Sequence, residues 1–173
     1  MKAKIEKSIE AKKMYETEND IDKPRRTGLS ALLNLRLADA IDLQMQLKQA
    51  HWNVKGPNFI SLHELFDKVA AAVELYGDTI AERIVQLGGI AEGTVRVVGM
   101  RSRLEEYPLT IGEGTAHVRA VAAAIAKFGS EIRGSISEAT QLKDDGTADI
   151  FTEVSRGIDK WLWFVEAHVQ ASH

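Results

Sequence analysis

The first stretch of sequence able to do chemistry is HWNVKGPNFISLHELFD, residues 51–67. It sets His51 and His63 twelve residues apart, on either side of Gly56-Pro57, and places Asp67 four residues after His63. Imidazole nitrogens and carboxylate oxygens are metal ligands, and the chain has no cysteine that could supply sulfur. Such ligands suit iron(II), manganese or zinc, and ligand softness alone does not choose among these metals. The segment predicts a metal site, with chance spacing as the alternative.

Two further carboxylates continue this pattern on one face of a helix. Asp78 and Glu82 are four residues apart, as are His63 and Asp67. At about 100° of rotation per residue, the four positions fall within about 100° around the helix axis. A charged stripe of this kind is usually solvated surface, and that interpretation stays open at this point.

The axial distance between these carboxylates decides how a site can close. Asp67 and Asp78 are eleven residues apart, which is about 16 Å along a helix. One metal centre cannot span that length, but two copies of the helix that cross antiparallel about a twofold axis can close the site. In that pairing His63 faces the partner's Glu82. Asp67 faces the partner's Asp78, which predicts two identical sites per dimer.

The predicted crossing point and the first histidine fit this pairing. The two helices would meet near Ala72, within a run of small residues from Ala70 to Val73 that permits close approach. His51 lies near the end of the preceding helix and can complete the cluster across the Gly-Pro turn. Because the chain has no E-x-x-H motif, it cannot build the usual di-iron site inside one bundle. We therefore expect iron at the dimer interface, held by two imidazoles and three carboxylates.

Helical periodicity predicts the elements that must position these residues. Apolar residues recur at three- and four-residue steps from Leu29, and Gly56-Pro57 ends that helix. A second helix, capped by Asn58 or Ser61, runs until Gly88-Gly89 stops it. We expect four helices, at about 29–55, 58–87, 110–143 and 147–170.

Residues 90–110, IAEGTVRVVGMRSRLEEYPLT, connect the second and third helices and are too many for a tight turn. Their valines suggest a strand, but no second strand is available to pair with it. Four long helices with one extended crossover favour an all-α, ferritin-like four-helix bundle. A chain of 173 residues is expected to form one domain, here an N-terminal arm, residues 1–28, followed by the bundle, residues 29–173.

Charge is distributed unevenly along the chain. The net charge is -3 at pH 7, yet residues 1–28 carry eight basic and six acidic groups. The first thirteen residues hold two glutamates and five lysines, which are Lys2, Lys4, Lys7, Lys12 and Lys13. A mobile basic arm of this kind is a candidate for binding the phosphates of double-stranded DNA without sequence preference. The alternatives are a solvated terminus, or a helix folded back on the body.

No apolar run approaches the about 20 residues that span a membrane, and the first residues lack the apolar stretch of a signal peptide. The absence of cysteine is compatible with a reducing compartment. We therefore expect a cytoplasmic protein without membrane contact, associated with the nucleoid if the arm binds DNA.

Three stretches of the chain resemble one known family. KQAHWNVKGPNFISLHELFD, GDTIAERIVQLGG and DDGTADIFTEVSRGIDKWLWFVE are similar to the Dps family, the DNA-binding proteins from starved cells, also called miniferritins. The resemblance runs from about residue 15 onward. It implies a hollow homododecamer built from twofold dimers, in which each chain is a four-helix bundle with a short helix in the crossover. It also implies oxidation of iron(II), preferably with hydrogen peroxide, and storage of the ferric mineral.

The resemblance also assigns roles to individual residues. A two-iron ferroxidase site between subunits, which zinc could also occupy, would take its catalytic ligands from His51, His63 and Asp67 of one chain and from Asp78 and Glu82 of its partner. Trp52, next to His51, would pack on this site as a second layer around the metal. The alternative for Trp52 is an ordinary interface contact, which is common for aromatic residues.

Acidic residues gather at the start of the predicted fourth helix, where Asp144, Asp145, Asp149 and Glu153 lie close together in sequence. Acidic residues at this position also complement the helix dipole, which is a purely structural role. In the Dps family this region surrounds a threefold acidic pore. The resemblance therefore implies an entry route for iron lined by Asp145, Asp149 and Glu153, where convergent carboxylates would concentrate cations.

Two functions from different classes follow. The first is a ferroxidase that consumes iron(II) and peroxide and thereby protects DNA. The second is a non-specific DNA-binding protein that compacts the nucleoid, in which the interface carboxylates are structural or bind an inert zinc ion. The enzyme is favoured, because the five ligand positions obey a spacing that DNA packing does not require.

Overall fold

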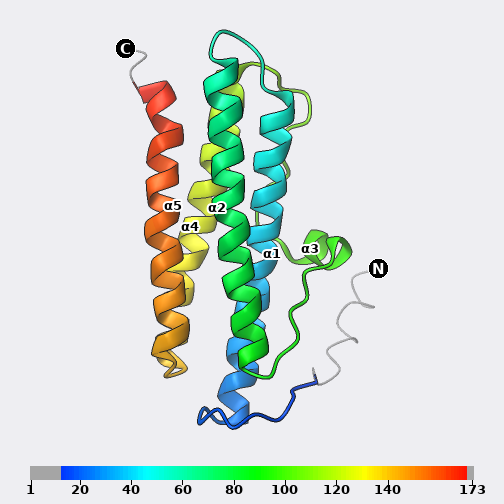
Figure 1. The fold of residues 1–173 in the computed structure, drawn as a ribbon, viewed down its shortest axis with the longest axis vertical. Coiled ribbons are helices and arrows are strands. Elements are labelled where there is room, and N and C mark those ends of the chain that lie inside the picture. Colours follow the sequence, from blue (N-terminus) through cyan, green and yellow to red (C-terminus); the bar gives the residue numbers. More distant parts are fainter. Residues whose placement is uncertain (1–12, 171–173) are drawn as a thin grey trace.

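Residues 13–170 are described by the computed structural model, and they form five helices. Four long helices lie side by side, and a short one stands beside them in the crossover (Figure 1). The elements are α1 (Lys23–Asn53), α2 (Phe59–Gln86), α3 (Val95–Arg101), α4 (Gly114–Gln141) and α5 (Asp145–Gln170). The predicted all-α, ferritin-like bundle with a short crossover helix is confirmed.

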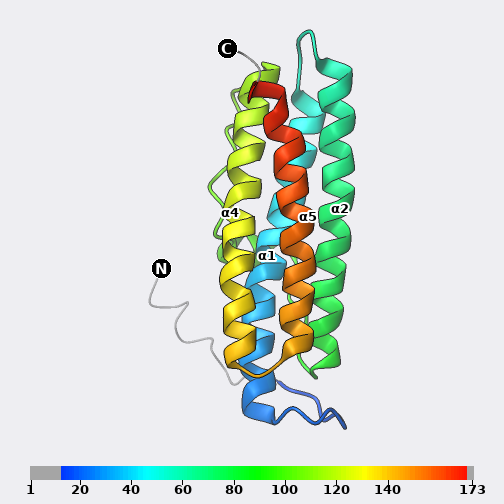
Figure 2. The same ribbon diagram turned by 90° about the vertical axis from the view of Figure 1, so that its left-hand side faces the viewer.

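The directions of the helices explain the long crossover. α1 and α2 form one antiparallel pair, and α4 and α5 form another (Figures 1 and 2). α2 and α4 run in the same direction, so residues 87–113 must travel the length of the bundle (Figure 1). They do so along the outside of α1, against which α3 packs.

The start of α1 is set by a cap and not by the apolar stripe. Asp22 is the N-cap: its Oδ1 accepts the backbone N–H of Arg25 at 3.0 Å, and Pro24 stands in the first turn. α1 therefore begins at Lys23, six residues before Leu29, where the apolar pattern starts. The predicted start at Leu29 was taken from the apolar pattern alone, which does not record the cap.

The two ends of α2 were predicted with different success. Asn58 is the N-cap, without a side-chain hydrogen bond, and Ser61 donates from Oγ to the Asn58 carbonyl within the first turn, so no capping box forms at Ser61. At the other end, Gly88 takes a φ of 82°, the left-handed conformation that ends a helix. A side chain there would place Cβ 2.5 Å from the carbonyl oxygen of Tyr15.

The core lies between the four long helices and is apolar. Its largest fully buried side chains come from all four of them and include Phe66, Phe128, Phe151, Leu33 and Ile84. The predicted stripe of α1 is buried, apart from Ile41, which is partly buried. Each such side chain stabilises the fold by about 1.5–3 kcal/mol, so burial of these faces sets the packing. None of the helices within residues 13–170 is both long and apolar enough to cross a membrane.

Polar side chains on the outer side of α1 hold the crossover. Asn34, Asp39, Asp42 and Gln46 each bond to a backbone or hydroxyl group between residues 90 and 105. These bonds satisfy crossover groups that would otherwise need a partner strand. Across residues 13–170 the strand-like pairing is limited to one isolated bridge between Lys55 and Glu113.

A partly buried cluster of charges joins α1, α4 and the crossover. Arg36 Nη2 lies 3.1 Å from Asp39 Oδ2, and Arg36 Nη1 donates to Glu131 Oε2 at 2.6 Å. Glu131 also accepts hydrogen bonds from Lys127 at 2.8 Å and from Arg103 at 3.0 Å. The bonds from Lys127 and Arg36 lower the pKa of Glu131 to about 2, whereas burial raises the pKa of Asp39.

The segment before α1 is tied to the end of α2. Tyr15 donates its N–H to the Gly88 carbonyl at 2.7 Å, and Arg26 Nη1 donates to the Leu87 carbonyl at 3.0 Å. Lys13 is exposed, with its Nζ 4.7 Å from the centre of the Tyr15 ring. Four of the five lysines predicted to bind DNA, which are Lys2, Lys4, Lys7 and Lys12, lie outside the described residues.

Candidate metal centre

His51 and His63 face each other across the turn between α1 and α2. His51 lies in the last turn of α1 and His63 near the start of α2, so the antiparallel pairing of these helices brings the two rings together. The rings are stacked, with centroids 3.7 Å apart and planes inclined by 22°. Both side chains are half-buried. The structure thus joins the two histidines that were singled out in the sequence.

Reciprocal hydrogen bonds decide which nitrogen of each ring is protonated. His51 Nδ1 is 2.7 Å from the carbonyl oxygen of His63, and His63 Nδ1 is 2.8 Å from the carbonyl oxygen of His51. A carbonyl oxygen can only accept, so each Nδ1 carries the hydrogen. In a neutral ring the other nitrogen, Nε2, then has the lone pair that binds a metal. The pair offers two Nε2 ligands in a fixed orientation.

Asp67 lies one turn after His63 on α2 and is exposed. Its Oδ1 accepts a hydrogen bond from Lys48 Nζ at 2.5 Å. This bond to the ammonium group lowers the pKa of Asp67, so its carboxylate is ionised at neutral pH. Two imidazoles and one carboxylate are therefore contributed from one end of the α1–α2 pair.

Lys48 is the residue at this centre that sequence reasoning did not single out. It comes from α1 and partly neutralises the carboxylate that a metal cation would bind. A usable signal was present, because Lys48 precedes His51 by three residues and so lies on the same face of the helix. A search for metal ligands does not consider Lys48, because its ammonium group has no lone pair to offer a metal ion.

Asp78 and Glu82 are exposed on α2, far from the histidines of their own chain. They follow His63 by about 22 Å and about 28 Å along the helix axis. Within residues 13–170, no group of three or more histidine, aspartate or glutamate side chains is placed to hold a metal ion. One chain thus joins His51 to His63, pairs Asp67 with Lys48 one turn further along α2, and leaves Asp78 and Glu82 elsewhere on α2.

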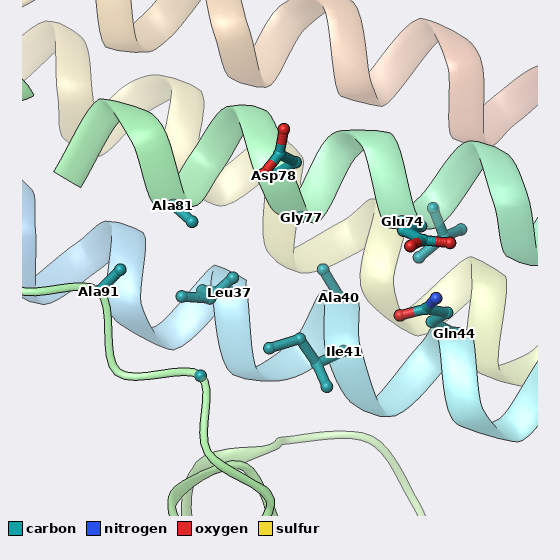
Figure 3. Close-up of a pocket in the computed structure, with 11 residues that line it drawn as sticks. Leu37, Ala40, Ile41, Gln44, Glu74, Gly77, Asp78, Ala81 and Ala91 are labelled. Atoms are coloured by element: carbon teal, nitrogen blue, oxygen red, sulfur yellow. The ribbon is translucent and has the colours of Figure 1, made fainter. Parts of the chain in front are cut away.

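Two grooves between α1 and α2 lie on either side of the predicted crossing point. One, of about 360 Å³, is lined by the carboxylate residues Glu74 and Asp78 (Figure 3). The other, of about 290 Å³, is lined by Lys48, Trp52 and Asp67. Small residues let the grooves form, among them Ala40, Ala70, Ala71, Gly77 and Ala81. Asp78 lines the first groove and Asp67 the second, so both grooves lie beside predicted ligands on α2.

Trp52 is open to solvent beside these grooves. Its side chain is 59% exposed, and Lys48 Nζ lies 5.9 Å from the centre of a Trp52 ring. Trp52 also lines a third groove, of about 610 Å³, between α1 and the crossover. Its predicted place as a second layer around a metal remains a prediction.

The acidic residues at the start of α5 are of two kinds. Asp144 is buried: both its carboxylate oxygens accept from Arg83 Nη2 at 2.9 Å, and Oδ1 accepts the N–H of Thr147 at 3.1 Å. Although burial raises it, the bonds from Thr147 and Arg83 hold the pKa of Asp144 below its ordinary value. Asp144 thus caps α5, which begins at Asp145 and not at Thr147 as predicted. The residues predicted to line a pore, Asp145, Asp149 and Glu153, are exposed at four-residue steps.

Proteins of known sequence and structure resemble this chain over most of its length. Residues 30–172 match the ferritin-like domain family. The chain is 44% identical over 158 residues to the DNA protection during starvation protein of Agrobacterium fabrum, covering 91% of this chain and 98% of that protein. The structure of Mycobacterium smegmatis Dps in a tetragonal crystal form has a TM-score of 0.86 at 30% identity, covering 91% and 96% of the two chains. DpsA14 from Streptomyces coelicolor has a TM-score of 0.86 at 32% identity, covering 93% and 95%.

Proposed function

Because the chain belongs to the Dps family of ferritin-like proteins, we propose that it oxidises iron(II) and stores the ferric product inside a homododecamer, which protects DNA from oxidative damage. The proposed oxidant is hydrogen peroxide in preference to oxygen. The observation that carries this proposal is the stacked pair of His51 and His63, with both Nδ1 atoms engaged and Asp67 one turn away.

A second copy of the chain would supply the remaining ligands. Asp78 and Glu82 are exposed on the same helix as His63 and Asp67, so an antiparallel partner can present them at the right places. Each dimer would then hold two ferroxidase centres, each with ligands from both chains.

Exposed apolar side chains beside α2 and α3 support such a dimer. Leu75 is 67% exposed, Val95 86%, Met100 68% and Leu109 71%. Exposed large apolar side chains often mark a contact surface when they lie together. We propose that these residues, together with the two grooves between α1 and α2, form the twofold interface.

In this centre iron(II) is the substrate. The Nε2 atoms of His51 and His63 would bind it, and the carboxylates would neutralise its charge and favour the more highly charged ferric product. Two iron(II) ions give one electron each, and with two protons they convert one hydrogen peroxide into two water molecules. The one-electron reaction that releases hydroxyl radical is thereby avoided. Zinc suits the same ligands but has no redox chemistry, so it would act as a competitor.

We also propose a route by which iron(II) enters the shell. Asp145, Asp149 and Glu153 are exposed along one face of α5, and three such faces around a threefold axis would surround a channel with carboxylates. Asp144 is not part of this route, because Arg83 and Thr147 occupy its carboxylate.

Stopped-flow measurement of iron(II) oxidation tests the proposed activity. The wild type is expected to react faster with peroxide than with oxygen. Loss of a residue that only supports a metal ligand typically costs about 10- to 100-fold, so His63→Ala or Asp78→Ala, which remove a ligand itself, should slow the reaction by more than that. Glu64→Ala, an exposed change next to His63, is the control and should keep the wild-type rate. Size-exclusion chromatography would check that each variant still assembles. Equal rates in all four proteins would refute the ferroxidase.

Non-specific DNA binding is a second proposed function, supported by the lysines of the N-terminal segment and by the name of the Agrobacterium fabrum relative. Many arms on one assembly would bind DNA phosphates together and strengthen the attachment. A gel-shift assay at low and moderate salt, with and without residues 1–13, tests this. The full chain should retard DNA most at low salt, and the truncated chain should not. Unchanged mobility throughout would rule the function out.

The two functions are distinguished by the same ligand variants. If the protein only compacted DNA and the interface site were structural, His63→Ala and Asp78→Ala would leave its function intact once the assembly had formed. Loss of peroxide-dependent oxidation in assembled variants that still bind DNA would show that the site is an enzyme and that the two functions are separate.

A further inference from the structure

Tyr107 and His117 form a buried pair behind the end of α1. Tyr107 belongs to the crossover and His117 to the start of α4. Tyr107 Oη lies 2.6 Å from His117 Nδ1, and the planes of the two rings are inclined by 21°. The residues are 7% and 1% exposed. The proposed oxidation of two iron(II) ions uses neither of them.

Burial decides where the proton of this hydrogen bond lies. It raises the pKa of the Tyr107 phenol and lowers the pKa of the His117 imidazole. The phenol therefore keeps its proton and donates it to Nδ1 of a neutral ring. Nε2 then carries the ring hydrogen, and among the described residues it has no hydrogen-bond partner. The result is a phenol with a base already in contact.

Two connections lead from this pair to the candidate metal centre. The peptide groups of Asn53 and Ile111 lie close enough to His117 to favour its protonated form, and Asn53 comes two residues after His51. On the other side, Tyr107 and Trp52 line the same groove of about 610 Å³. Trp52 directly follows His51 in the sequence.

We propose that Tyr107 is a reversible one-electron donor to the iron centre, with His117 as the acceptor of its phenolic proton. This inference rests on the proposed peroxide-dependent oxidation of iron(II). It concerns a centre that holds a single iron(II) ion. Such an ion supplies only one electron, and alone it would cleave peroxide to hydroxide and hydroxyl radical.

The step balances when each donor gives one electron. The O–O bond of hydrogen peroxide breaks, iron(II) becomes iron(III), and Tyr107 becomes a phenoxyl radical. The O–H bond of Tyr107 breaks and its proton moves to Nδ1 of His117, while two protons from solvent complete two water molecules. A later iron(II) ion reduces the radical, His117 returns the proton, and the pair is restored.

The surroundings of the three tyrosines separate Tyr107 from the other two. Tyr15 is 51% exposed, and the contact of its ring is with the ammonium group of Lys13. The hydroxyl of Tyr76 lies near the indole of Trp161, which can only donate, and Glu153 acts on it through electrostatics and not through a hydrogen bond. Tyr107 has an imidazole nitrogen at its hydroxyl, and its burial keeps a radical away from solvent.

Electron paramagnetic resonance of freeze-quenched samples tests the proposal in the assembled full-length protein. Less than one iron(II) per proposed centre is mixed with excess hydrogen peroxide. A tyrosyl radical is expected in the wild type, in Tyr15→Phe and in Tyr76→Phe, and its loss is expected in Tyr107→Phe. Phenylalanine keeps the ring and hence the packing. Spin-trapped hydroxyl radical should rise several-fold in Tyr107→Phe alone.

A second experiment tests the pair without iron. A photogenerated one-electron oxidant applied to the iron-free protein should produce the Tyr107 radical, and His117→Gln should slow its formation several-fold, because the amide accepts a hydrogen bond but is not a base. Thermal unfolding would verify that His117→Gln is folded, and Tyr76→Phe serves as the control variant.

The outcomes separate this inference from the proposed function. If iron is oxidised by peroxide but the tyrosyl signal is absent or survives Tyr107→Phe, the electron-donor role is wrong and the ferroxidase stands. If iron is not oxidised at all, the ferroxidase is wrong, and the role of Tyr107 at the iron centre falls with it. If the photochemical radical does not depend on Tyr107 and His117, the pair is not redox-active.

Discussion

The two imidazoles of the candidate metal centre orient each other through the backbone. A metal-binding histidine usually donates its second ring N–H to a carbonyl or carboxylate, which holds the ring in place. Here that carbonyl belongs to the other histidine in both directions, so His51 and His63 form one unit. Replacing one imidazole leaves the backbone carbonyl that holds the other ring, so the remaining ring keeps its orientation unless the backbone moves. Replacing Asp67 leaves both hydrogen bonds in place.

Lys48 provides a prediction at the residue scale. Its ammonium group competes with a metal cation for Asp67, so Lys48→Met should tighten iron(II) binding a few-fold, the modest effect expected of a partly exposed ion pair. Anaerobic isothermal titration calorimetry of the assembled protein would measure this.

The matched control for this prediction is Lys68→Met. Lys68 pairs with Glu64 at 3.7 Å on the exposed side of α2, and its loss removes the same charge without touching a proposed ligand. Tighter binding in both variants would mean that overall charge, and not the contact with Asp67, is responsible.

Among the helices, α1 carries more than one role. Its apolar residues face the core, while its polar residues hold the crossover and bind Glu131 on α4. The buried Arg36 and Asp39 are part of this arrangement, and they interrupt the simple alternation of buried apolar and exposed polar faces. These polar contacts fix the path of the crossover along α1, and helical periodicity does not record them.

Glu131 provides a prediction at the scale of elements. Its pKa in the folded protein is about 2, below its ordinary value of 4.5. Its contribution to stability is therefore fully present above about pH 4.5 and is lost as the pH falls toward 2. Glu131→Gln should lower the free energy of unfolding by about 1–3 kcal/mol at pH 7, and the difference should shrink below pH 4.5.

Denaturant unfolding at pH 7, 4 and 2.5 would measure this difference. Glu138→Gln is the control, because Glu138 is exposed on the same helix. A loss of stability that is equal at all three pH values would show that Glu131 acts through packing and not through its charge.

For the whole molecule, the separation of the ligands along α2 is the deciding feature. A ferroxidase centre would form only where two chains meet, so its activity is tied to assembly. Pairs of inactive variants can therefore restore it. A chain with His63→Ala lacks one half of the site, and a chain with Asp78→Ala lacks the other half.

Mixing these two variants gives a prediction at the scale of the assembly. A mixed dimer has one centre with both changes and one centre with neither, and random pairing puts about half of the chains in mixed dimers. Co-assembled variants should therefore recover about a quarter of the wild-type rate of iron(II) oxidation. Stopped-flow kinetics would measure this, with each variant assembled alone as the control. No recovery in verified mixed assemblies would mean that the centre lies within one chain.

Local patterns in the sequence predicted much of the fold and the spacing of the candidate ligands. The helical periods predicted the four long helices, and Gly88 was recognised as the stop of α2. The spacing of His63, Asp67, Asp78 and Glu82 placed them on one helix at distances that follow from helix geometry. The start of α1 was predicted too late. Asp144 was grouped with the other acidic residues at the start of the fourth helix, and its role as the cap of α5 was not singled out. Both features depend on hydrogen bonds that no hydrophobic period records.

What the sequence by itself determined was the class of fold and the separation of the ligands along one helix, since rise and rotation per residue are properties of the local backbone. Only the tertiary structure decided that His51 stacks on His63, that Lys48 bonds to Asp67 and that Tyr107 meets His117. Each of these contacts joins side chains across a turn or the crossover. Its geometry depends on how distant segments pack, and no spacing within a helix contains that information.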